Sequence, residues 1–241
     1  MRGSHMDNAA RIADAYLAWW HGAGVDSAVA DAPVDWLRPE SSVAATARRP
    51  AGGPPKATTP RDLESFRQWL EQDAAQPERR WATRIILPAG PADAPLMVVT
   101  DMPDPADGEA NILLADRAGA LFDAMLRAIG LDRAQCHVAS LFCARPPGGM
   151  VEAADIATAA TRMRLHVALA RPRRLLLLGD RTIRALMPDA PAAPNGLRDF
   201  NHQGGIVPAV ATFHPRLLLG QPAAKAECWR ALQSLIEEPR P

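Results

Sequence analysis

The chain has 241 residues, of which 27 are basic and 27 acidic, so its formal net charge at pH 7 is zero. This length suits one large domain, or one domain with an appendage. A zero net charge excludes a strong overall field toward nucleic acid, although it leaves a local basic groove open.

The three cysteines lie at scattered positions, Cys136, Cys143 and Cys228, and form no C-x-x-C pair. This spacing argues against a disulfide framework and against a zinc site, and it predicts a reducing, cytoplasmic setting. No apolar run approaches the length of a membrane span, and no signal peptide is visible. We therefore expect no membrane partner.

The N-terminal quarter of the chain differs in composition from the rest. Residues 1–6 resemble an expression-tag scar and are set aside. Residues 8–23 carry apolar side chains at helical spacing, which predicts an amphipathic helix. Residues 32–59 are rich in Pro, Ala, Gly and Arg and predict a linker. We expect an N-terminal helical appendage over residues 7–60, followed by one domain over residues 61–241.

Strand and helix patterns alternate through that domain. The predicted strands cover residues 95–100, 136–142, 174–179 and 206–213, and helical patterns cover residues 118–131, 153–169, 181–186 and 223–236. The third strand is continuously apolar, as a strand covered on both faces should be. The alternation predicts an α/β fold, a three-layer α/β/α sandwich with a mostly parallel four-stranded sheet.

The carboxyl ends of parallel strands share one edge of a sheet, where ligands of open α/β sheets bind. Three predicted loops meet at that edge, over residues 101–105, 140–149 and 214–222. The chain has no P-loop, no G-x-S-x-G and no G-x-G-x-x-G, which excludes the usual sites for NTP hydrolysis, serine hydrolysis and dinucleotide binding. The loops bring a carboxylate, a hydroxyl, an imidazole and two guanidinium groups to the edge: Asp101, Ser140, His214, Arg145 and Arg216.

Three adjacent leucines at 217–219 stand between Pro215 and Pro222, and these prolines predict a loop. Because loops normally lie on the surface, the leucines allow two interpretations. One leucine packs beneath the loop, or the loop inserts an apolar wedge into a partner. His214 likewise is either a hydrogen-bonded structural residue or a catalytic group.

Four short motifs punctuate this domain: T-D-M-P-D at 100–104, A-D-R-A-G at 115–119, S-L-F-C-A-R-P-P at 140–147 and H-P-R-L-L at 214–218. Their order resembles the uracil-DNA glycosylase superfamily, nearest the branch that carries an iron–sulfur cluster. That branch reads G-E-A-P-G, V-G-[KR]-A-G, N-x-x-K-C-R-P-P and H-P-S-x-L-L. Pro103 and Gly119 also stand at the expected step of sixteen (119 − 103). The resemblance spans residues 61–241.

The chain departs from that branch at the cluster-binding cysteines. Ala144 stands at one of these positions, and Cys143 falls one residue too early. Thr158 replaces the last cysteine, and residues 73–78 contain no C-x-x-C. A four-thiolate cluster therefore cannot form, and no cofactor or metal is implied.

Other departures affect the expected base site. The glutamate of the first motif is Asp101, and the base-reading asparagine is Ser140. Leu114 takes the place of the phenylalanine on which a base stacks, and Asp116 replaces a glycine. His214 and the leucine segment are retained.

The resemblance implies a DNA glycosylase that flips out a deaminated base, uracil and also hypoxanthine or xanthine, and hydrolyses its N-glycosidic bond. A monomer acting on single- or double-stranded DNA in base-excision repair is expected. The implied catalytic residues are His214 and Asp101. The implied base-binding residues are Met102, Leu114 and Ser140, and the implied DNA-binding residues are Arg145, Arg216, Leu217 and Leu218.

A second hypothesis stays open, that of a catalytically inactive relative which binds DNA or a partner. It is supported by three simultaneous replacements: the base-reading asparagine by Ser140, the stacking phenylalanine by Leu114 and the glycine by Asp116. The retained His214 and the acidic Asp101 favour the active enzyme instead.

Overall fold

The computed structural model describes residues 59–82, 84–188 and 196–236. The chain divides into two compact units, Met1–Gly53 and Pro54–Pro241, and all described residues belong to the second. The predicted helix at residues 8–23 lies outside the described residues, as does nearly all of the predicted linker. None of the helices in the described ranges is both long and apolar enough to span a bilayer.

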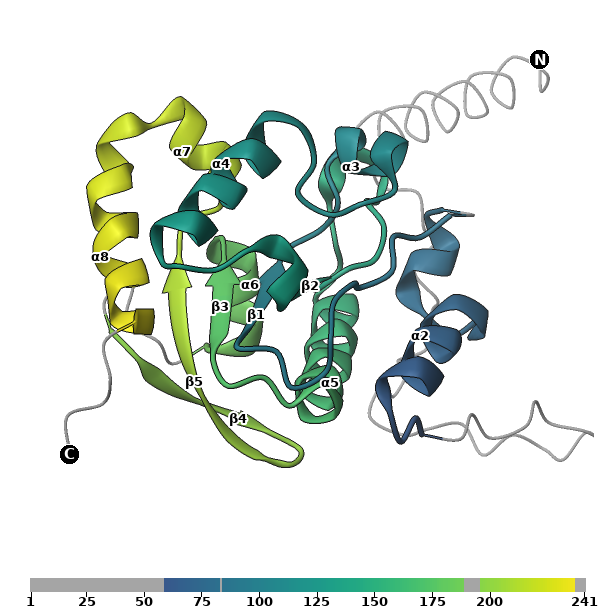
Figure 1. Ribbon diagram of the computed structural model, residues 1–241. Helices are drawn as coiled ribbons and strands as arrows, with labels where there is room; N and C mark the ends of the chain where they lie inside the picture. Colours follow the sequence, from purple (N-terminus) through teal and green to yellow (C-terminus); the bar gives the residue numbers. More distant parts are fainter. Residues whose placement is uncertain (1–58, 83, 189–195, 237–241) are drawn as a thin grey trace, which may run out of the picture. The chain divides into compact units, whose positions relative to one another are not determined.

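A five-stranded sheet forms the centre of this unit, with the strand order β2-β1-β3-β5-β4 (Figure 1). Four strands run parallel to their neighbours, and β4 alone runs antiparallel, against β5. The predicted α/β fold with a mostly parallel sheet is therefore confirmed. The strands are β1 (Leu96–Thr100), β2 (Cys136–Ser140), β3 (Leu175–Leu178), β4 (Arg198–His202) and β5 (Gly205–Thr212).

The prediction of four strands was one strand too few. Strand β4 lies at the sheet edge as one arm of a hairpin with β5, and Phe200 is its only buried residue. Because its other residues are charged or polar, the segment lacks the apolar alternation by which a strand is recognised.

Apolar side chains fill both faces of the sheet. Along β1, Leu96 and Val98 point to one face, while Met97 and Val99 point to the other. Helices α4, α7 and α8 cover the first face, and helices α5 and α6 cover the second (Figure 1). All four leucines of β3 are fully buried, each worth roughly 2 kcal/mol of transfer free energy.

The helices follow the predicted pattern with two additions. Helix α3 replaces part of a predicted turn, and helix α7 replaces the predicted leucine loop. Asp62 caps the N-terminus of helix α2, because its carboxylate accepts the Ser65 backbone N–H at 2.8 Å. The helices are α2 (Leu63–Gln72), α3 (Pro105–Ala110), α4 (Asp116–Ala128), α5 (Ala153–Ala170), α6 (Asp180–Leu186), α7 (Pro215–Gly220) and α8 (Lys225–Ile236), and the 3-10 turns are η1 (Pro77–Arg80), η2 (Arg133–Gln135), η3 (Pro147–Gly149) and η4 (Pro222–Ala224).

Candidate active site at the carboxyl edge of the sheet

The ends of β1, β3 and β5 bring the polar groups of this edge together. Asp101 follows β1, helix α6 follows β3, and His214 follows β5 by two residues. Because β3 lies between β1 and β5, the strand ends that lead to Asp101 and His214 are two strands apart, about 10 Å at the usual spacing. Both groups therefore lie on the same edge of the molecule.

Asp101 is a partly buried carboxylate held by an arginine. Arg181, in the first turn of α6, donates from Nη1 to Asp101 Oδ2 at 3.0 Å, and from Nη2 to the Gly149 carbonyl at 3.2 Å. Burial raises the pKa of Asp101 above its usual value, and the positive charge of Arg181 opposes that rise. The ionised form of Asp101 therefore depends on Arg181.

Sequence reasoning did not identify Arg181. The signal was present, because residue 181 lies two positions beyond the end of the predicted strand at residues 174–179. An arginine in a first helical turn is common on protein surfaces, and only the sheet order shows that it faces Asp101.

His214 caps the N-terminus of α7. Its Nδ1 accepts the backbone N–H of Arg216 at 3.1 Å. Burial, reinforced by the charge of Arg216, lowers the pKa of His214 to about 4. The ring is therefore neutral at pH 7, and because Nδ1 accepts a hydrogen bond, we assign its proton to Nε2. His214 can donate one hydrogen bond from Nε2 without carrying a charge.

Arg145 and Arg216 converge on a second acidic residue, Asp104. Arg145 donates from Nη2 to Asp104 Oδ1 at 2.7 Å, and from Nε to the Pro103 carbonyl at 2.8 Å. Arg216 Nη1 contacts the same Asp104 oxygen. The two predicted DNA-binding arginines therefore lie together, joined through one carboxylate. We call Asp104, Arg145 and Arg216 the arginine clamp.

The predicted base-binding residues Met102, Leu114 and Ser140 are all buried, with 4%, 2% and 4% of their surfaces exposed. Ser140 and its register partner Thr100 end strands β2 and β1. The alternation of both strands turns these two side chains toward the face that holds Leu114. Neither hydroxyl has a hydrogen-bond partner among the described residues. Such buried hydroxyls are available to a polar ligand.

The turn that carries Leu114 is tightly braced. Leu114 and Asp116 both have a φ of +54°, a backbone conformation that favours glycine. Helix α4 packs so closely on this turn that a Cβ at Gly119 would lie 2.0 Å from the Leu114 carbonyl oxygen. Arg133 donates to the carbonyl groups of Leu113 and Leu114, both at 2.9 Å. The glycine of the A-D-R-A-G motif is therefore required by packing.

The leucine segment is a short helix in which the three leucines differ in exposure. Leu218 is 1% exposed and packs in the core, whereas Leu217 and Leu219 are 38% and 39% exposed. One leucine therefore packs beneath the segment, as the first interpretation expects, whereas insertion of an exposed leucine into a partner stays a prediction.

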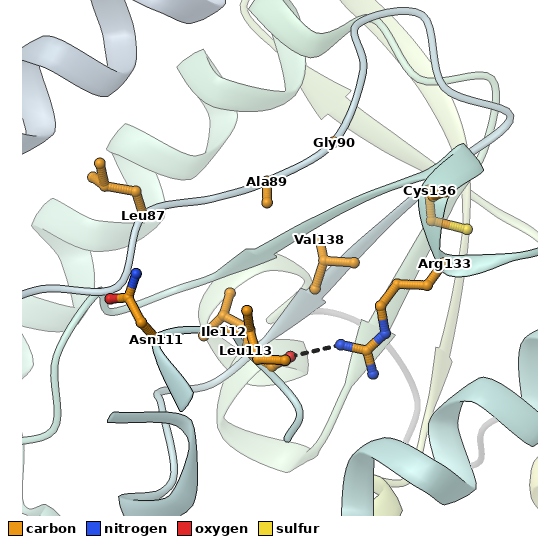
Figure 2. Close-up of a pocket in the computed structure, with 10 residues that line it drawn as sticks. Leu87, Ala89, Gly90, Asn111, Ile112, Leu113, Arg133, Cys136 and Val138 are labelled. Atoms are coloured by element: carbon orange, nitrogen blue, oxygen red, sulfur yellow. Dashed lines mark hydrogen bonds between the residues drawn. The ribbon is translucent and has the colours of Figure 1, made fainter. Parts of the chain in front are cut away.

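A cavity of about 470 Å³ lies beside edge strand β2 (Figure 2). Its walls are mainly apolar, and the guanidinium of Arg133 is already engaged with the Leu113 carbonyl. A second cavity of about 480 Å³ is lined by residues of α2, of the segment that follows α2 and of α5, together with Gln203. Neither cavity is lined by Asp101 or His214. The candidate catalytic groups therefore lie outside both cavities, at the carboxyl edge of the sheet.

A family model described as the uracil DNA glycosylase superfamily matches residues 87–233. The chain belongs to the uracil DNA glycosylase superfamily. The match covers all five strands and every residue of the arginine clamp, together with Asp101, Arg181 and His214. Among curated proteins, no match is found. Membership of the uracil DNA glycosylase superfamily supports a glycosylase-like function with DNA as the substrate.

A buried ion pair stands among the segments where the resembling branch of the superfamily holds its iron–sulfur cluster. Arg162 Nη1 donates to Glu78 Oε2 at 2.9 Å and to Gln76 Oε1 at 2.6 Å. Arg162 Nη2 donates to the Leu141 carbonyl at 2.8 Å, and the Cys143 backbone N–H donates to Glu78 Oε1 at 2.9 Å. This network ties η1 to α5 and to the segment after β2.

The residues at these positions do not fit a four-thiolate cluster. Cys143 is the only cysteine of this region in the described chain, and burial raises the pKa of its thiol to about 11, which disfavours a thiolate ligand. Ala144 and Thr158 supply no metal-binding atoms of the required kind. In the described ranges, no three His, Cys, Asp or Glu side chains are grouped as metal ligands.

Proposed function

We propose that this protein is a monofunctional DNA glycosylase that hydrolyses the N-glycosidic bond of a flipped deaminated base in base-excision repair. Uracil is the first candidate base, and hypoxanthine and xanthine are the others. The observation that carries the proposal is the presence, at one sheet edge, of a neutral imidazole that can donate from Nε2 and a partly buried carboxylate.

Cleavage of the N-glycosidic bond builds positive charge on the sugar and negative charge on the departing base. In the proposal, the Asp101 carboxylate stabilises the sugar and orients the attacking water. His214 donates from Nε2 to an oxygen of the base, and the backbone N–H near Met102 is the second donor. A preorganised donor of this kind is typically worth about 3–4 kcal/mol in the transition state.

Ser140 is the proposed reader of the base edge, beside the Thr100 hydroxyl. An amide presents a fixed donor and acceptor, whereas a hydroxyl rotates and can serve as either. Two unpartnered hydroxyls support acceptance of more than one deaminated base. Leu114 is proposed to provide the apolar floor of this site, in place of an aromatic ring.

The DNA contacts divide between α7 and the arginine clamp. Base extrusion costs a few kcal/mol, and an apolar side chain that fills the vacated stack offsets part of that cost. Leu217 is the proposed wedge because it is exposed, and the buried Leu218 supports it from below. Arg145 and Arg216 are the proposed phosphate contacts.

One observation favours the second candidate function, that of an inactive DNA-binding relative. Leu114 is buried in the core cluster, so the side chain that replaces the stacking ring offers a base little surface. In this case the protein would bind DNA and release no base.

Incubation with a panel of oligonucleotides decides between the two functions. Each single strand or duplex carries one uracil, hypoxanthine or xanthine, and alkali then cleaves the strand wherever a base has been lost. We expect scission on at least one substrate, with uracil first. DNA binding without scission on any substrate would support the inactive relative.

A further inference from the structure

Asp104 is an acidic residue at the carboxyl edge that joins two arginines and to which the proposed chemistry assigns no role. It ends the T-D-M-P-D motif, at a position where the resembling motif has glycine. Its backbone caps helix α3, and its carboxylate turns toward two arginines from other loops. Three segments that are far apart in the sequence therefore meet at one carboxylate.

The arginine clamp has the form of a phosphate site. Two guanidinium groups approach the same anionic oxygen, Asp104 Oδ1, and guanidinium donors suit the oxygens of carboxylate and phosphate alike. Asp104 is 18% exposed, while Arg145 and Arg216 are 32% and 57% exposed. Solvent, and hence a DNA backbone, can reach the arginines from outside.

We propose that Asp104 holds, in the DNA-free protein, the place of a DNA phosphate between Arg145 and Arg216, and that DNA binds by displacing its carboxylate. This inference rests on the proposed function, since it assumes DNA as the ligand. Partly exposed ion pairs are weak, so each one opposes DNA binding by only about two- to fivefold. In return, the pairs hold both arginines in position before DNA arrives.

The exchange is linked to the proposed catalytic group. The backbone N–H of Arg216 donates to His214 Nδ1, and this hydrogen bond orients the imidazole. A phosphate held by the Arg216 side chain therefore lies close to His214. DNA that displaces Asp104 is thereby placed beside His214, at the edge where Asp101 also lies.

The substitution Asp104→Asn tests this exchange of the Asp104 carboxylate for a DNA phosphate. Asparagine is as good an N-cap residue for α3 as aspartate, but it carries no charge. Binding to a short fluorescein-labelled undamaged duplex is measured by anisotropy at low salt. We expect Asp104→Asn to lower the Kd roughly four- to twenty-fivefold, the combined effect of releasing two partly exposed ion pairs. The gain should vanish in a protein that also carries Arg145→Gln and Arg216→Gln.

Asp180→Asn is the matched control, because it removes one negative charge at the same edge. Asp180 is 74% exposed and pairs at 2.9 Å with Arg184, which lies outside the arginine clamp. We expect a much smaller gain from this substitution. Equal gains from Asp104→Asn and Asp180→Asn would overturn the exchange, as would a gain that persists without the two arginines.

Two further outcomes separate this inference from the proposed function. If neither the wild type nor Asp104→Asn binds DNA, both the exchange and the DNA partner are wrong. If Asp104→Asn shows the predicted gain but no oligonucleotide loses its base, the exchange stands and the glycosylase proposal fails.

Discussion

Arg181 controls the protonation of Asp101 more than any other single side chain near it. Burial alone favours the neutral carboxylic acid, and the guanidinium 3.0 Å away favours the carboxylate. In the proposed reaction only the carboxylate can stabilise a positively charged sugar. Arg181 is therefore a positioning residue, which acts on the substrate through Asp101.

Substitution of Arg181 by glutamine should shift the pH profile of base release. Without the guanidinium the pKa of Asp101 rises further, so the acidic limb of kcat/KM should move to higher pH, while Arg181→Lys should restore part of the shift. Arg184→Gln, on the same helix, is the control and should leave the limb in place. A uniform loss of activity with an unmoved acidic limb would assign Arg181 a merely structural role.

At the scale of elements, the prolines at 215 and 222 predict a loop, whereas the structure has helix α7 between them. Proline is favoured in the first turn of a helix because its missing N–H needs no partner there, and Pro215 directly follows the capping residue His214. The sequence thus contained the correct signal. The dipeptide His214-Pro215 is typical of a helix start as well as of a strand end.

Strand ends predicted most of the candidate site, because Asp101, Ser140 and His214 each lie at or just beyond a predicted strand. The partners could not be predicted in the same way. That Arg181 pairs with Asp101, or that Asp104 joins two arginines, depends on strand order and on side-chain direction. Neither property is encoded in local periodicity. Strand β4 was missed for a related reason, since an edge strand with one buried residue carries almost no pattern.

Helix α7 should separate stability from DNA binding. Leu218→Ala removes a buried side chain and should lower the free energy of unfolding by about 2–5 kcal/mol. Leu217→Ala should change it by less than about 0.5 kcal/mol, yet slow base release from duplex DNA more than from single strands. Urea unfolding and single-turnover rates measure the two effects.

Leu219→Ala is the control for α7, because Leu219 has nearly the same exposure as Leu217 on the same helix. If Leu217→Ala slows release equally on duplex and single-stranded DNA, the wedge is not needed to open the stack, and the assignment fails.

At the scale of the whole molecule, the pair of Glu78 and Arg162 joins three segments. Their side chains are 1% and 4% exposed, and Gln76, Leu141 and Cys143 supply the remaining hydrogen bonds. The pair joins segments in which the sequence resemblance places the cluster-binding positions of the related branch. We infer that in this protein it secures the segment containing η1 to the central sheet.

Loss of one partner of this pair should destabilise the protein strongly. Glu78→Gln leaves the Arg162 charge buried without its counter-ion, which typically costs about 3–5 kcal/mol. Arg171→Gln is the control, because it breaks the solvent-exposed pair with Asp93 and should leave the free energy of unfolding nearly unchanged. Urea unfolding measures both, and equal effects would show that the buried pair has no special role.

The convergence of His214 and Asp101 in one working site is tested most directly by single-turnover base release from a uracil-containing single strand. His214→Asn should slow release by about 10²–10³-fold, the usual loss when one preorganised donor is removed. His202→Asn changes a histidine on the far edge strand β4 and should release the base at the wild-type rate. Release by His214→Asn at the wild-type rate would contradict the site.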